Sequence, residues 1–138
     1  MSKVQELHQQ AMNLAEQADL KKLNGDTTQV EECLRQALAL EAEAAQLIAK
    51  DMTAEPTRSI LHRSAATLAI ECGELQMAER LIAVAIAGKP PLDVAEELKD
   101  LFIQINLRKY LERRGVHLAE EQLQLLACQR VRHLPKLQ

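Results

Sequence analysis

The chain of 138 residues carries a formal net charge of −3 and is nearly free of aromatic residues, with no Trp, one Tyr and one Phe. It is long enough for one domain, whose core must be built from aliphatic side chains. No apolar run approaches the ~18 residues of a membrane span and the polar start does not resemble a signal peptide, so we expect a cytoplasmic protein with no membrane partner.

Charge is distributed unevenly along the chain. Residues 1–107 contain 10 Lys and Arg against 17 Asp and Glu, whereas residues 108–138 contain 7 against 3. The acidic body disfavours nucleic acid as a partner. The basic end could contact an acidic surface, but a solvated tail that balances the acidic body is the plainer interpretation.

Two long helices are predicted first. Apolar residues recur at intervals of three and four over residues 2–23, the period of an amphipathic helix. The stretch Asn24-Gly25-Asp26 ends it, because Gly suits a left-handed C-terminal cap, and Asp or the following Thr can cap the next helix. The next apolar face predicts a helix over residues 27–50.

A short linker separates these helices from a second pair. Pro56 suits the first position of a helix, and the pattern predicts helices over residues 56–72 and 75–87. Gly73-Glu74 forms the turn between them, and residues 88–91, with one Gly and two Pro, end the pair.

The remaining chain predicts a fifth helix and an ambiguous end. The fifth helix begins at Asp93, in a possible capping box with Glu96, and ends at Arg114 before Gly115. Residues 118–126 suit a helix face, although the alternation over 122–125 also suits a strand, which would need a partner from elsewhere. We favour the helix and expect residues 134–138 to be loose.

The two hairpins repeat when the chain is shifted by 48 residues. The matches are Ala18 with Ala66, Gly25-Asp26 with Gly73-Glu74, Leu34 with Ile82, and Ala37 with Ala85. Small residues let helices approach closely and Gly permits the tight turn, so each half predicts a helical hairpin.

Residues 59–90 resemble one tetratricopeptide repeat. Ala78, Ile82 and Pro90 stand where that family has Ala, a large apolar residue and Pro; Ala65, Ala66 and Ala69 take the places of Leu, Gly and Tyr, and His62 that of Trp. Residues 11–42 match less well, with Ala42 in place of the Pro. The stretch from Glu55 to Pro90 is also similar to small bacterial, notably cyanobacterial, helical-repeat proteins.

The resemblance implies an all-α, right-handed, tetratricopeptide-like array of antiparallel hairpins with five or six helices. It covers a domain at residues 1–115, followed at 116–138 by a helix or a loose tail. In such arrays the first helix of each hairpin lines a groove that binds peptides. On the second hairpin this helix offers Arg58, His62, Arg63, Thr67 and Glu71.

Two interpretations of these residues stay open. Arg63, followed one turn later by Thr67, could hold a carboxylate by charge-assisted hydrogen bonds. Alternatively, Arg58 and Arg63 pair with Glu55 or Glu71 on the surface. The corresponding residues of the first hairpin, Ala15, Asp19 and Lys22, depart from a basic clamp.

No residue pattern predicts catalysis. The four His residues have no ligand at a metal-binding spacing, the four Gly residues are isolated, and the three Cys residues form no Cys-x-x-Cys pair. Glu31, Glu32, Glu41 and Glu43 are expected on a solvated helix face. We therefore expect no enzyme activity, no cofactor and no metal.

The sequence thus favours a protein-interaction adaptor that binds a peptide or protein partner. The alternative is a small chaperone or antitoxin-like inhibitor that covers one client protein. Because repeat arrays usually need three units, we expect the third from the C-terminal segment or from a second subunit, which makes a homo-oligomer possible. Exposure of Leu101, Ile105, Leu111 and Leu125 would support self-association.

Overall fold

The computed structural model describes the backbone of residues 2–133 and the side chains of residues 2–126. Over this range the secondary structure is helical and contains no strand, which confirms the all-α part of the predicted fold class. The elements are α1 (Lys3–Leu23), α2 (Thr27–Leu47), the short 3-10 helix η1 (Met52–Ala54), α3 (Thr57–Glu71), α4 (Leu75–Ile86), α5 (Leu92–Arg113) and α6 (Glu120–His133). The segment 118–126, for which the sequence suited both a helix and a strand, therefore belongs to a helix from Glu120 on. Residues 134–138, which we expected to be loose, lie outside the described residues.

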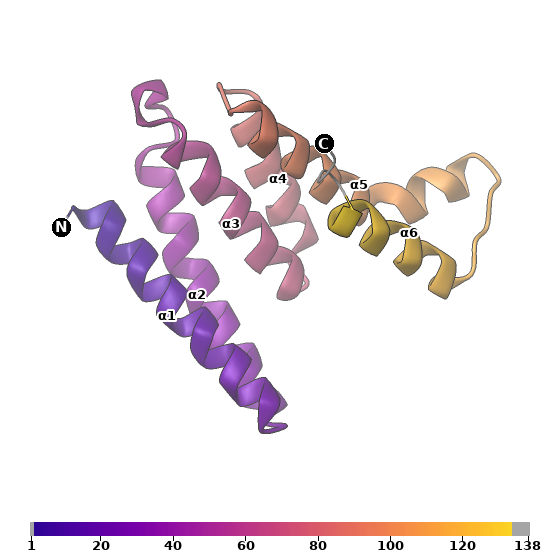
Figure 1. Ribbon diagram of the computed structural model, residues 1–138, viewed down its shortest axis with the longest axis horizontal. Helices are drawn as coiled ribbons and strands as arrows, with labels where there is room; N and C mark the ends of the chain where they lie inside the picture. The colour runs from indigo at the N-terminus through magenta and orange to yellow at the C-terminus, as the bar shows by residue number, and fades with distance from the viewer. Residues whose placement is uncertain (1, 134–138) are drawn as a thin grey trace.

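The helices pack in chain order. The pairs α1–α2 and α3–α4 are antiparallel hairpins, joined by contacts between α2 and α3 (Figure 1). Helix α5 contacts both α3 and α4, extends beyond them, and is contacted by α6. None of the described helices is both long and apolar enough to cross a membrane.

The same turn closes both hairpins. Gly25 and Gly73 have φ of +77° and +78°, a left-handed conformation that costs Gly little. The next amide in each case donates back to the last turn of the preceding helix, Asp26 to Lys21 at 3.1 Å and Glu74 to Ala69 at 2.8 Å. These bonds satisfy carbonyls that a helix end leaves open. The predicted turns are confirmed, and so is the capping of α2 by Asp26, which accepts from the amide of Gln29.

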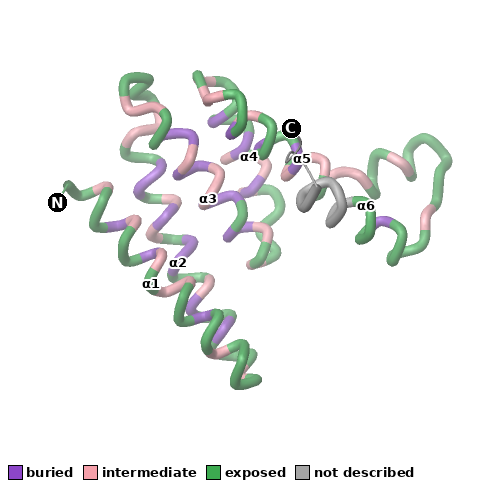
Figure 2. Tube along the Cα trace, viewed as in Figure 1, coloured by how far each residue is buried: buried purple, intermediate pink, exposed green. Residues whose placement is uncertain are grey.

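Small residues form the helix contacts. Ala37, Ala69 and Ala78 are fully buried where α2, α3 and α4 meet, and Ala66 and Ala85 are fully buried beside Ile82. Figure 2 shows that buried positions concentrate in α2 and α3 and become sparse along α5 and α6. Close packing of Ala therefore replaces the bulky side chains that this sequence lacks.

One expectation about the start of α5 fails. The capping box at Asp93 is wrong: the helix begins at Leu92 after Pro91, and Asp93 lies in the first turn, where it accepts from the amide of Val94. The helix follows directly on Pro90-Pro91 and so begins one residue earlier than the acidic pair suggested. Leu101 and Ile105, whose exposure would have supported self-association, pack against the core, whereas Leu125 on α6 is exposed.

Glu41 also differs from expectation. We expected it on a solvated face, yet it is 0% exposed between α1 and α2. Both carboxylate oxygens lie 3.0 Å from Nδ1 of His8. The pair is separated by 33 residues, so no local pattern links the two side chains.

Candidate partner-binding face

One side of α3 presents three of the five predicted site residues. Arg63, Thr67 and Glu71 recur at intervals of four, which places them in one row. The hydroxyl of Thr67 donates to the carbonyl of Arg63 at 3.1 Å. We call these residues the α3 face, together with Asp19 and Lys22 of α1 and Glu97 of α5, which flank the row as follows.

At one end of the row, α5 supplies the partner of Arg63. The guanidinium is ion-paired with the carboxylate of Glu97, and the two side chains are 32% and 54% exposed. The pair therefore does not form with Glu55 or Glu71. Exposed ion pairs contribute only about 0–1 kcal/mol, so this one leaves the Arg63 guanidinium available to a competing carboxylate.

At the other end, Glu71 lies in the field of two charges from α1. Partial burial raises the pKa of its carboxyl, the Lys22 ammonium lowers it, and the Asp19 carboxylate raises it further. The net pKa is above its ordinary value. Charged groups from the first helix of each hairpin thus meet along α3, and both signs are present.

The other two predicted residues, Arg58 and His62, are not on this face. Arg58 is 2% exposed, and its guanidinium donates hydrogen bonds to backbone carbonyls of α4 and of the segment after α2. Nε donates to the carbonyl of Ala49 at 2.5 Å, and a terminal nitrogen donates to the carbonyl of Val84 at 2.8 Å. These carbonyls end α2 and α4, where a helix dipole favours a cation.

Glu55 completes this buried cluster. Its carboxylate accepts from the amide and hydroxyl of Ser59 at 3.0 and 2.7 Å, from the amide of Lys89 at 3.2 Å, and from Arg58 at 3.3 Å. Burial raises its pKa, but these bonds and the Arg58 charge outweigh burial, and the net pKa is lowered. The predicted Arg58–Glu55 pair therefore exists, but as an internal clamp of α2, α3 and α4.

Gly88 makes room for the clamp. A Cβ placed at Gly88 would lie 2.7 Å from Cζ of Arg58, closer than side-chain atoms pack. The sequence marked this Gly only as the end of a hairpin. Its spatial role could not be found from spacing, because Arg58 lies 30 residues earlier.

His62 is held by the same cluster. Its ring is 2% exposed, and Nδ1 lies 2.7 Å from the carbonyl of Arg58. Burial lowers the pKa of the ring, with a further lowering from the Arg58 charge, against the raising effects of this hydrogen bond and of Glu55. His62 is thus a neutral interior group, and neither it nor Arg58 can contact a partner on the α3 face.

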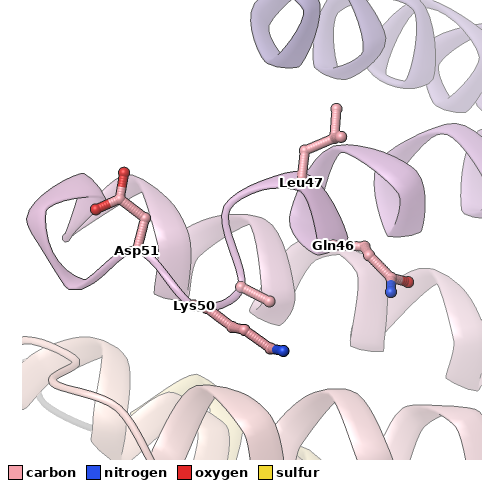
Figure 3. A pocket seen from close by; sticks show the side chains of 5 residues that line it. Gln46, Leu47, Lys50 and Asp51 are labelled. Atoms are coloured by element: carbon pink, nitrogen blue, oxygen red, sulfur yellow. The ribbon is translucent and has the colours of Figure 1, made fainter.

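Two hollows on the surface lie outside the α3 face. At the end of α2, a depression of about 610 Å³ is lined by Gln46, Leu47, Ala49, Lys50 and Asp51. Figure 3 shows Gln46 and Lys50 extending to one side, with Leu47 and Asp51 pointing to the other. A second of similar volume lies between α4 and α5 and includes Ile86 and Phe102, both partly exposed.

The basic side chains at the end of α5 contact other residues of the same chain. Arg108 pairs with Glu120 of α6, and the guanidinium carbons of Arg113 and Arg114 lie 6.0 and 5.4 Å from the ring centre of Tyr110. Within residues 2–126, His, Cys, Asp and Glu side chains form no group of three or more that could hold a metal ion.

Comparison with protein-family models, with characterised proteins and with solved structures finds no match to this chain. A functional proposal therefore rests on the residues and geometry described above.

Proposed function

We propose that this protein is a non-catalytic interaction adaptor that binds an acidic peptide segment of a protein partner on the α3 face. One observation carries the proposal. Arg63 and Lys22 supply two accessible cations on the α3 face, to which α1, α3 and α5 all contribute, and Arg63 is held by an exposed ion pair.

We further propose that the hairpins form a tetratricopeptide-like array. The repeat of 48 residues supports this, because the Gly turn and the buried Ala contacts recur in both hairpins. In such an array α1, α3 and α5 are the first helices of successive units, the position that presents a peptide-binding surface.

The binding step follows from the charges. A carboxylate of the partner replaces Glu97 as the acceptor for Arg63. Such a carboxylate can accept two hydrogen bonds, which suits the planar fork of a guanidinium. The hydroxyl of Thr67 lies one turn away for a further bond. Glu97 keeps Arg63 extended until the peptide arrives, which lowers the ordering cost of binding.

The test is an affinity pull-down with mass spectrometry, followed by titration calorimetry with the captured partner. Arg63→Glu is compared with Arg113→Glu, which makes the same charge change at the far end of α5. We expect Arg63→Glu to weaken binding by about 10-fold or more, the value of one charge-assisted hydrogen bond, and Arg113→Glu to leave it unchanged.

The other outcomes assign the surface differently. Loss with Arg113→Glu alone would place the contact at the basic end of α5. Retention by both variants would overturn the α3 face as the site. If neither wild type nor variant captured a partner, a self-assembling structural protein would be the better interpretation.

A further inference from the structure

A groove between α2 and α4 has no residue in common with the α3 face. Its volume is about 240 Å³. Its walls are aliphatic and come from Ala42 and Ala49 on the α2 side and from Met77, Leu81 and Val84 on α4. Gln46 and Arg80, both exposed, also line it, and the one residue from α3 is His62.

The His62 ring presents a hydrogen-bond acceptor to this groove. A backbone carbonyl can only accept, so Nδ1, which lies 2.7 Å from the carbonyl of Arg58, carries the ring proton. In the neutral ring Nε2 is then an acceptor. In the described part of the chain, every buried side-chain nitrogen and oxygen has a hydrogen-bond partner. The hydrogen bond of His62 is made by Nδ1, and Nε2 has no partner among the described residues, so Nε2 is not fully buried. Because His62 lines the groove, we infer that Nε2 is accessible from it.

We propose that this groove binds an aromatic side chain with a single hydrogen-bond donor, Tyr or Trp, from a protein partner, and that the donor bonds to Nε2 of His62. Size and chemistry agree. A cavity of about 150 Å³ holds benzene, so this groove accommodates one ring system but is small for a drug-sized ligand.

Other side chains fit less well. Phe would fill the apolar groove but leave Nε2 without a hydrogen-bond donor. A carboxylate would place a second acceptor beside Nε2, which is itself an acceptor. Tyr and Trp combine an apolar body with one polar handle, which is why they anchor protein interfaces. The guanidinium of Arg80 at the groove can stack on the ring face.

The groove is held in shape before a ligand arrives. Arg58 binds the carbonyls of Ala49 and Val84, one from each wall, and its own carbonyl orients His62. Two walls and the acceptor are thus fixed by one buried residue, through its side chain and its backbone carbonyl. Such preorganisation reduces the entropy lost on binding.

The test is NMR titration of the wild-type protein with N-acetyl-L-tyrosinamide, N-acetyl-L-tryptophanamide and, as the donor-free control, N-acetyl-L-phenylalaninamide. We expect saturable shifts of Ala42, Ala49 and Leu81 signals, and binding about 5-fold weaker for the Phe compound, from the loss of one hydrogen bond. The tighter of the Tyr and Trp compounds identifies the anchor. Equal affinity for all three, or shifts outside the groove, would overturn the proposal.

Two variants of α2 test whether the ligand binds in this groove while His62 is left unchanged. Ala42→Phe fills the groove and should abolish the shifts, whereas Ala39→Phe, at an exposed position outside it, should leave them intact. Retained binding in Ala42→Phe would contradict the assignment. His62→Phe should reduce the Tyr compound to the affinity of the Phe compound, and Arg63→Glu should have no effect, which separates this site from the adaptor face.

Discussion

Arg58 and Glu55 meet at 3.3 Å in the interior, where their remaining hydrogen bonds reach the ends of α2 and α4, the start of α3 and the turn after α4. Three helices from two hairpins thus depend on one ion pair. Its charges are compensated by backbone donors and acceptors, so it does not leave an unpaired buried group.

Replacing Arg58 by Met should greatly lower the free energy of unfolding. The substitution leaves the Glu55 carboxylate without its cation and frees the carbonyls of Ala49 and Val84, and breaking a buried pair costs about 3–5 kcal/mol. Urea denaturation measures this loss in the free energy of unfolding. Arg35→Met, which breaks an exposed pair with Glu32, is the control and should cost less than about 1 kcal/mol. Similar losses in both would show that Arg58 is not a clamp.

Gly88→Ala should also destabilise the fold, by about 1–3 kcal/mol, because the new methyl overlaps the Arg58 guanidinium. The decisive measurement is a double-mutant cycle with Arg58→Met. Once the guanidinium is gone, Gly88→Ala should cost much less, since neighbouring substitutions are not additive. Additive losses would place the cause in the backbone.

His62 should make stability depend on pH. Burial lowers the pKa of its ring in the folded protein below the ordinary 6.5, so the unfolded chain binds the proton first. The free energy of unfolding should therefore fall as pH drops below about 6.5, until the pH reaches the lowered pKa of the folded state. The Arg58 charge nearby also disfavours the charged ring, whereas Glu55 favours it.

Urea denaturation at a series of pH values checks this prediction. His62→Gln should flatten the curve between pH 5 and 7, the range set approximately by a His titration. His117→Gln, at an exposed position between α5 and α6, should leave the slope unchanged. Equal slopes in wild type and His62→Gln would refute the role of His62.

The buried carboxylate of Glu41 makes a separate prediction. His8→Leu removes its partner and should cost about 3 kcal/mol, whereas the double variant His8→Leu with Glu41→Met should recover most of the loss, because an apolar pair needs no compensation. Thermal denaturation of wild type, His8→Leu and the double variant measures the loss and its recovery. A double variant less stable than His8→Leu would show that Glu41 has another essential contact.

The helices and their turns could be predicted from the sequence because they depend on local rules. Spacing of apolar residues placed α1 to α5 within a few residues, and Gly25 and Gly73 marked turns that require a left-handed residue. The Ala residues at the helix contacts followed from the 48-residue repeat. The last helix stayed ambiguous because its apolar pattern suits two periods.

The fate of the polar side chains was decided by the tertiary structure. In the sequence, Arg58, His62 and Glu41 cannot be distinguished from polar residues on a solvated helix face. They are buried because α1, α2 and α4 pack around them. Three of their partners, Ala49, Val84 and His8, lie 9 to 33 residues away. The sequence by itself determined which segments are helical and where they turn. Which polar groups remain accessible to a partner depends on how those helices pack, because burial is a property of several elements together.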